Sequence, residues 1–410
     1  MKIVEHTIQK LKRTSVFILA GGVGQRLFPL TRERSKPAVS FGGKYRIIDF
    51  TLSNCLNSGL RRINLVVQYK SHSLDRHLKL GWNVFSSRLG EHITALPPQF
   101  YTETWYKGTA DAIYQNLFVI KDENPEQVLI LSGDHIYKMD YGRMLEFHIE
   151  RKADLTVACL PLPRDEATRF GVISVDAKQH VTRFNEKPEQ PDTIPGDETL
   201  SLCSMGVYIF STRELVRRLI QDAKRSSNHD FGTDIIPEMI EGKKVFAFPF
   251  TDDEGQTRYW RDIGTLDAYY DTSIDLINVN PQFDLYSPGW PIYTYQGSHP
   301  PAKFVFNQGD RVGVALNSLT SGGVIISGGR VERSILSPRV QVHSQAQVND
   351  SILMDDVDVG RHCLINRAII DKRVKIPDGV QVGCDLESDR KLFPVTDNGI
   401  VVIPSDYHFD

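Results

Sequence analysis

Short runs of aliphatic residues alternate with segments of helical spacing up to about residue 275 of this chain. Continuous apolar runs of this length predict buried strands, and they occur at Val16–Ala20, Ile63–Gln68 and Val128–Ser132. Helical spacing is found at Asp49–Ser58, Ser73–Leu80, Thr109–Lys121 and Tyr141–Lys152. The alternation predicts an α/β fold with a Rossmann-like, mostly parallel sheet that helices cover on both faces.

Polar and glycine-rich positions mark where these elements begin and end. Asp49 and Thr109 are the expected N-caps of their helices, because short polar side chains accept hydrogen bonds from free backbone amides. Ligands of such sheets bind beyond the carboxyl ends of the strands. The loops Gly21–Gly24 and Gly133–His135 are therefore the first candidates for a binding site.

The pattern changes between residues 278 and 305, where five prolines and several tyrosines occur without clear periodicity. We expect an ordered linker here, because the aromatic side chains need a surface on which to pack. A flexible tether is the alternative.

An internal repeat of seventeen residues follows, with units that begin at Val331, Val348 and Ile365. Each unit carries two short aliphatic pairs separated by polar residues, which is typical of a parallel β-helix whose coils stack their inward side chains. The predicted organisation is an α/β domain over residues 1–277, an ordered linker over 278–316 and a β-helix over 317–410. Such coils more often serve packing and oligomer contact than catalysis.

Composition narrows the class of protein. The 48 basic and 51 acidic side chains leave a net charge of −3, which removes any general case for binding nucleic acid or a membrane surface. The five cysteines are scattered, which argues against a zinc site or a disulfide framework and for a reducing compartment. The apolar run Val16–Ala20 is too short for a signal sequence or a membrane span, so we expect a cytoplasmic protein.

The loop after the first predicted strand has the chemistry of an anion site. Glycines let backbone amides approach a phosphate closely, although the loop matches neither the Walker A pattern nor G-x-G-x-x-G. One acid, Glu33, stands among six cations, namely Arg26, Arg32, Arg34, Lys36, Lys44 and Arg46. Such an excess favours a group with several phosphates, such as a triphosphate. A solvated basic loop is the alternative.

Motifs along nearly the whole chain resemble those of the sugar-nucleotide pyrophosphorylases, and in particular the glucose-1-phosphate adenylyltransferases (ADP-glucose pyrophosphorylases). They occur in the family's order: GGVGQRL at residues 21–27, SKPA, FGGKYRIIDFTLSNCLNSG, WYKGTADAIYQN, SGDHIYKMDY, FNEKP, SMGVYIF, HDFGTDIIP and YWRDIGTLDAYY. The resemblance implies a nucleotidyltransferase domain followed by a left-handed β-helix. It also implies transfer of AMP from ATP to glucose 1-phosphate, which gives ADP-glucose for glycogen synthesis, with pyrophosphate as the leaving group.

The resemblance assigns residues to each part of that reaction. Asp134 and Asp262 would hold the catalytic Mg²⁺, a cation that prefers oxygen ligands. Asp134, Lys36 and Arg26 are the expected catalytic residues. The nucleotide would contact Gly21, Gly22, Gly24, Arg26, Lys36, Gln68, Gly108 and Thr109. Glucose 1-phosphate would contact Tyr106, Gly171, Glu186, Lys187, Ser204 and Asp230. No histidine is assigned, since His72, His77, His135 and His148 show no metal-ligand spacing beside acids.

The family further implies a homotetramer regulated by a small phosphometabolite that binds between the two domains. Arg34, Lys44 and Arg46 fit the basic set expected there. Three positions depart from the enterobacterial pattern: Glu33 replaces a lysine, Ser40 a histidine and Val23 an arginine. We therefore expect fructose 1,6-bisphosphate to activate poorly, and a monophosphate or a pyruvate-like acid to activate better.

Three other functions remain possible from the sequence. The same chemistry on another base or sugar would make UDP-glucose or dTDP-glucose. A non-catalytic regulatory subunit would be expected to lack Asp134, Asp262 or Lys187, and all three are present. An acyltransferase would use a histidine of the β-helix such as His343 or His362, but would leave the first domain unexplained.

Overall fold

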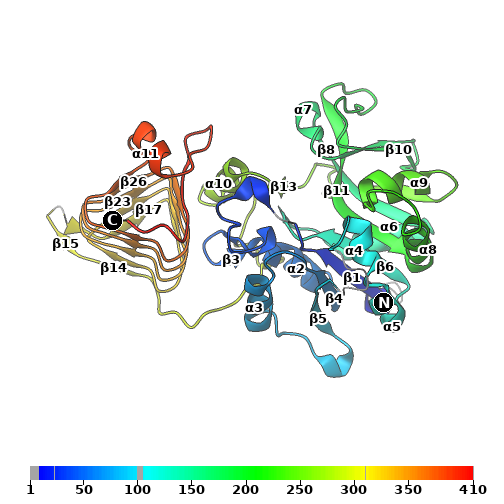
Figure 1. Cartoon of the computed structure of the whole chain (residues 1–410), viewed down its shortest axis with the longest axis horizontal. Helices are drawn as coiled ribbons and strands as arrows, with labels where there is room; N and C mark the ends of the chain where they lie inside the picture. The colour runs from blue at the N-terminus through cyan, green and yellow to red at the C-terminus, as the bar shows by residue number, and fades with distance from the viewer. Residues whose placement is uncertain (1–8, 23, 99–104, 310, 410) are drawn as a thin grey trace.

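The computed structural model describes residues 9–22, 24–98, 105–309 and 311–409, so Val23 lies outside the described residues. An α/β domain is followed by a long linker and a stack of short strands that forms a separate coil (Figure 1). Each helix within the described ranges is too short or too polar to cross a lipid bilayer.

A nine-stranded sheet forms the centre of the α/β domain. Its strands are β1 Thr14–Leu19, β4 Arg62–Val66, β5 His92–Leu96, β6 Gln127–Ser132, β8 Leu155–Pro163, β9 Gly171–Val175, β10 Val181–Glu186, β11 Leu200–Ser211 and β12 Val245–Pro249. Strands β6, β1, β4 and β5 are neighbours in this order and run parallel. β11 pairs antiparallel with β6, β8 and β9 and extends the sheet. The three predicted strands are confirmed as β1, β4 and β6.

Helices cover both faces of this sheet, as the sequence pattern predicted. The α-helices with bounds inside the described ranges are α2 Ile47–Asn57, α3 His72–Gly81, α4 Thr109–Tyr114, α5 Leu117–Glu123, α6 Tyr141–Glu150, α7 Arg164–Ala167, α8 Thr212–Asp222, α9 Ile236–Ile240, α10 Leu266–Asp275 and α11 Leu386–Leu392. Val16 and Ile18 of β1 belong to the apolar core that also contains buried residues of α2, α3 and α6. Phe17 belongs to the opposite core, with α4, α5, α8 and α9. Successive residues of a strand point to opposite faces, and here both faces are buried.

Two predicted helix starts are wrong in detail. Asp49 is the third residue of α2 and accepts a 2.8 Å hydrogen bond from the amide of Arg46, which is the N-cap. Gly108 is the N-cap of α4, and Thr109 is its first residue. The single helix predicted over 109–121 is two helices, α4 and α5. The Asn116 side chain donates to the Ala112 carbonyl at 2.8 Å, and such local side-chain bonds compete with the helical backbone pattern.

The linker is ordered against helix α2, and a flexible tether is the wrong interpretation. Trp290 Nε1 donates to Asn54 Oδ1 at 2.8 Å, and Thr294 Oγ1 donates to Asp49 Oδ2 at 2.6 Å. The rings of Phe283 and Phe50 meet edge to face with their centroids 5.3 Å apart. The aromatic residues of the linker thus find the packing surface that the sequence pattern required.

Three five-stranded parallel sheets form the β-helix. Their strands are β14 Lys303–Val305, β17 Val314–Leu316, β18 Leu319–Thr320, β19 Ile325–Ser327, β20 Arg330–Glu332, β21 Ile335–Leu336, β22 Gln341–Val342, β23 Gln347–Asn349, β24 Ile352–Leu353, β25 Asp358–Val359, β26 Leu364–Asn366, β27 Ala368–Ile370, β28 Lys375–Ile376, β29 Gln381–Val382 and β30 Val401–Ile403. Val331 pairs with Val348, and Val348 with Ile365, so the seventeen-residue repeat is confirmed. β14 pairs with β19 and lies inside the range 278–316 predicted as linker.

The two parts of the chain share one apolar cluster. Ile47 and Phe50 of α2 belong to the same buried cluster as Ile335, Ile352 and Ile369 of the β-helix. One face of the β-helix therefore packs directly on the α/β domain, close to the basic loop that follows β1.

Candidate active site

Four segments bring the candidate catalytic residues together at one edge of the sheet. β1 ends before the glycine loop, β6 ends before Asp134, and Lys36 begins the short 3₁₀ helix η2, Lys36–Ala38. The fourth segment is β13, Trp260–Asp262, which pairs antiparallel with β7, His135–Tyr137. Because Asp262 is opposite His135 in this pair, residues more than a hundred positions apart become neighbours.

Lys36 bridges the two predicted metal acids. Its Nζ lies 2.9 Å from Asp134 Oδ2 and 2.8 Å from Asp262 Oδ1, and the residue is only 7% exposed. Burial alone would lower the pKa of Lys36, but Asp134 and Asp262 hold it above its usual value. Burial would likewise raise the pKa of Asp134, whereas Lys36 and then His135 hold it well below its usual range. We call Lys36, Asp134 and Asp262 the catalytic triangle.

The acids of the triangle fit a divalent cation. Asp134 Oδ1 is buried and has no hydrogen-bond partner in the described part of the chain, so it keeps a free acceptor. Asp134, His135 and Asp262 each offer one ligand atom, and these atoms lie within 4.8 Å of one another. His135 Nε2 is 3.4 Å from Asp134 Oδ1. The sequence analysis assigned no role to His135, and the structure places its Nε2 beside both acids, so it is a third candidate ligand.

The glycine loop approaches this triangle from β1. Gly24 has φ +64 and precedes the 3₁₀ helix η1, Gln25–Leu27, a conformation that favours glycine. A Cβ on Gly21 would lie 3.0 Å from the Cβ of Gln68, so these two predicted nucleotide contacts are adjacent. Gly22 has open space around it. Arg26 is exposed and lines a cavity of about 380 Å³ together with Asp262.

A second group of predicted residues lies around the start of α4. Thr109 Oγ1 donates to Asp230 Oδ2 at 2.7 Å and accepts from the amide of Phe231 at 3.0 Å. A Cβ on Gly108 would fall 2.3 Å from the His229 carbonyl oxygen, so only glycine fits. A predicted nucleotide residue and a predicted sugar residue are thus joined directly.

The remaining predicted sugar residues line the antiparallel side of the sheet. Glu186 Oε1 pairs with Lys187 Nζ at 3.0 Å, and the Lys187 side chain is 64% exposed. A Cβ on Gly171 would lie 2.9 Å from Glu186 Oε2, so these two predicted sugar residues are adjacent. Ser204 Oγ donates to the hydroxyl of Tyr208 at 3.4 Å. Tyr106 stands apart from these residues in its contacts, since its hydroxyl accepts from the side chain of Asn116 at 3.1 Å.

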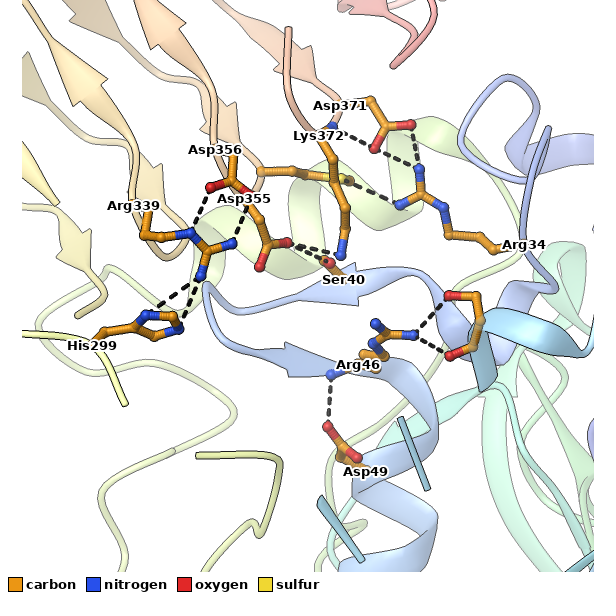
Figure 2. A network of polar contacts seen from close by, with 12 residues as sticks. Arg34, Ser40, Arg46, Asp49, His299, Arg339, Asp355, Asp356, Asp371 and Lys372 are labelled. Atoms are coloured by element: carbon orange, nitrogen blue, oxygen red, sulfur yellow. Dashed lines mark hydrogen bonds and ion pairs between the residues drawn. The ribbon is translucent and has the colours of Figure 1, made fainter. Parts of the chain in front are cut away.

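The predicted effector residues lie at a different place, between the two domains, and Figure 2 shows two of them, Arg34 and Arg46. A cavity of about 690 Å³ is lined by Arg34, Lys44 and Arg46 and by cations from other segments, namely Arg76, Arg339, Lys372 and Arg373. Sequence reasoning missed these four, because their distance along the chain from the basic loop gives no signal. Glu33 and Ser40 also line this interdomain cleft.

The three predicted effector cations have different partners. Arg34 contacts Asp371 of the β-helix, with Nη2 2.7 Å from Oδ1, whereas Arg46 Nη1 donates to the carbonyl and hydroxyl oxygens of Ser73. Lys44 lies over the ring of Tyr45 with its Nζ 5.4 Å from the centroid. Burial lowers the pKa of Arg46.

Comparison with known proteins supports the fold of both parts of the chain. A Nucleotidyl transferase family model matches residues 15–278, and a model of the GlmU-like C-terminal hexapeptide matches residues 300–403, which supports the left-handed β-helix. A glucose-1-phosphate adenylyltransferase of Methylococcus capsulatus is 50% identical over 96% of this chain and 94% of its own length. The Rhodopirellula baltica protein of the same name is 52% identical over 96% of this chain and 90% of its own length. The Vibrio cholerae glucose-1-phosphate adenylyltransferase 2 is 48% identical over 97% of this chain and 99% of its own length. The chain is a nucleotidyltransferase and belongs to the glucose-1-phosphate adenylyltransferase family.

Proposed function

We propose that this protein transfers AMP from ATP to glucose 1-phosphate and releases ADP-glucose and pyrophosphate. The observation that carries the proposal is the catalytic triangle, in a chain about half identical over nearly its whole length to proteins of that name. In the reaction, a phosphate oxygen of glucose 1-phosphate forms a bond to the α-phosphorus of ATP. The bond between the α- and β-phosphates breaks, and pyrophosphate leaves with its electron pair.

Asp134 and Asp262 would hold the metal ion. We assign Mg²⁺ because this ion prefers oxygen ligands such as these carboxylates. When bound, the ion supplies positive charge to the phosphate oxygens. Lys36 adds a fixed cation between the same two acids, and the raised pKa keeps it protonated. Arg26, exposed at the neighbouring cavity, can neutralise the β- and γ-phosphates. The chain contributes mainly position and charge, as phosphoryl-group chemistry requires.

Glucose 1-phosphate is assigned to the side of Glu186, Lys187 and Asp230. Lys187 is an exposed cation suited to the sugar phosphate, and the carboxylates of Glu186 and Asp230 can accept hydrogen bonds from sugar hydroxyls. The hydrogen bond between Thr109 and Asp230 supports a sugar subsite beside the expected nucleotide loop. ATP is assigned to the glycine loop, Gln68 and Gly108.

The interdomain cleft is proposed to take a small phosphometabolite effector in a homotetrameric protein. Its surplus of cations supports an anionic ligand. Glu33 lines the same cleft and repels a second phosphate, which supports weak activation by fructose 1,6-bisphosphate.

Exchange of radiolabelled pyrophosphate into ATP tests the proposed reaction. We expect exchange that depends on glucose 1-phosphate and a divalent cation, and ADP-glucose as the product in the forward direction. A panel of ATP, UTP, dTTP and GTP at equal concentration tests the choice of base, and ATP should give by far the highest kcat/KM. Absence of exchange would indicate a non-catalytic subunit, and a preference for UTP or dTTP would overturn the choice of base.

An effector panel tests regulation separately. Fructose 1,6-bisphosphate, a hexose monophosphate, pyruvate and inorganic phosphate are compared for their effect on ADP-glucose synthesis. Strong activation by micromolar fructose 1,6-bisphosphate would contradict the proposal about Glu33. A molecular mass in solution that differs from the mass of four chains would contradict the tetramer.

A further inference from the structure

Arg34 and Asp371 form a buried ion pair between the two domains (Figure 2). Arg34 Nη2 lies 2.7 Å from Asp371 Oδ1, and the two residues are 6% and 1% exposed. The Arg34 Nη1 atom lies 4.0 Å from Met354 Sδ, another residue of the β-helix. The end of the Arg34 side chain therefore contacts β-helix residues where the residue lines the interdomain cleft.

Arg34 is only two residues before Lys36 of the catalytic triangle. The connection is short and structured, because η2 begins at Lys36 and the amide of Ala38 donates to the Ser35 carbonyl at 3.0 Å. Ser35 is fully buried, and Lys36 is buried and contacts the carboxylates of Asp134 and Asp262. A displacement of the Arg34 backbone would therefore be passed to the backbone of Lys36 through this short, buried segment.

Asp262 is connected to the β-helix by a second route. Helix α10 begins four residues after Asp262, and its Tyr270 hydroxyl donates to the Asp350 carbonyl at 2.6 Å. Asp267 of the same helix accepts from Thr396 Oγ1 at 2.7 Å. Two of the three members of the catalytic triangle thus lie close in the chain to a contact with the β-helix.

We infer that the β-helix positions the catalytic triangle, and that Arg34 and Asp371 are the positioning residues that set the location of Lys36. The inference rests on the proposed function, because it assigns the pair an effect that passes through Lys36. It differs from the effector contact expected for Arg34 from the sequence. Neither residue touches a substrate in this role.

The physical basis is the cost of an unpaired buried charge. Asp371→Asn leaves the Arg34 guanidinium without its carboxylate in an enclosed position, so Arg34 must move or draw in water. Lys36 then moves relative to Asp134 and Asp262. Because a displacement of about 1 Å at a reacting centre can cost about 100-fold in rate, we expect kcat of Asp371→Asn to fall about 10- to 100-fold. The KM for glucose 1-phosphate should change less than about 3-fold, since Lys187 is untouched.

The test compares Asp371→Asn in the native background and in a Lys36→Ala background by pyrophosphate exchange in the full-length protein. If the pair acts through Lys36, Asp371→Asn lowers the rate in the native background and causes no further loss when Lys36 is absent. The matched control is Asp253→Asn, which breaks an exposed arginine–aspartate pair with Arg143 at 2.6 Å. It should keep kcat within about 2-fold, as exposed pairs contribute little.

Arg34→Lys carries the same test if Asp371→Asn does not fold. It keeps the buried positive charge but loses the guanidinium geometry, and we expect kcat to fall about 3- to 10-fold. A kcat of Asp371→Asn within 2-fold of the native protein, or an equal loss in both backgrounds, would overturn the inference while the proposed reaction stands. A native protein without exchange would overturn the proposed function itself.

Discussion

Lys36 is buried and Lys372 is half-buried, and both contact carboxylates, but the pKa of one is raised and that of the other is lowered. Lys36 contacts two acids, Asp134 and Asp262, at 2.9 and 2.8 Å. Lys372 contacts one acid, Asp355, at 2.8 Å. Burial lowers the pKa of Lys372, and the arginines Arg46 and Arg34 lower it further against the opposing effect of Asp355. The pKa of Lys36 is raised instead.

The difference shows what each site can bind. The catalytic triangle has one more negative than positive charge, and Asp134 Oδ1 has no hydrogen-bond partner among the described residues, so the triangle can take a cation. The interdomain cleft has more cations than carboxylates, so it can take an anion. The same residue type serves opposite purposes because its neighbours, not its burial, set the sign of the local charge.

Removal of a carboxylate from the triangle should have the largest effect. Asp134→Asn keeps the shape of the side chain but loses the charge that faces the metal and Lys36. We expect kcat to fall about 1,000-fold or more, because preorganised charge carries much of such catalysis. ATP affinity and the circular-dichroism spectrum should stay nearly native. Titration calorimetry with Mn²⁺ should show loss of metal binding, and full kcat would contradict the role of Asp134.

Loss of the exposed lysine at the sugar subsite should have the next largest effect. Lys187→Ala removes a charge-assisted hydrogen bond of about 1.5–3 kcal/mol, so the KM for glucose 1-phosphate should rise about 10- to 100-fold. The KM for ATP should be almost unchanged. Steady-state kinetics with each substrate varied in turn checks this, and a rise in the ATP KM alone would reverse the assignment of the two subsites.

A charge change at the interdomain cleft should be smaller and confined to regulation. Glu33→Lys replaces the acid that faces the cleft by a cation, and the affinity for fructose 1,6-bisphosphate should rise about 10-fold. Glu254→Lys in an exposed turn makes the same change in net charge and is the matched control. Activation curves for both variants measure the affinity for fructose 1,6-bisphosphate. An equal gain in the two variants would mean that overall charge, not the cleft, determines affinity.

The smallest expected effect is a difference in pH dependence. Lys372 has a lowered pKa, so it loses its proton at a lower pH than an ordinary lysine, and anion binding should weaken as the pH rises towards the usual pKa of a lysine. Lys36, with a raised pKa, stays protonated in this range. Effector titrations at several pH values measure the change. Lys372→Arg should remove this pH dependence, because arginine stays charged. If the pH dependence of effector binding is the same in Lys372→Arg, Lys372 is not its cause.

Regular elements could be predicted from the sequence because their signals are local. The strands β1, β4 and β6 and the seventeen-residue coil follow from apolar periodicity alone. The cap of α2 could not be predicted correctly. Asp49 is fully buried and also accepts from His77, Trp82 and Thr294, so tertiary contacts decide its role.

The candidate site shows the same division. Asp134 and Asp262 were proposed from motifs, but the antiparallel pairing of β7 with β13 that brings Asp262 opposite His135 has no local signal. The first coil of the β-helix, which begins with β14, was predicted as linker because its strands lie outside the regular repeat.

The sequence by itself determined the strands β1, β4 and β6, the coil and the chemical types at the site, since each depends on neighbours within a few residues. Only the tertiary structure decided which charges face one another. Arg34 and Lys36 belong to one basic loop, yet one is paired with the β-helix and the other with two catalytic acids. The physical reason is that Coulomb interactions act through space, and a buried charge needs the partner that folding brings to it.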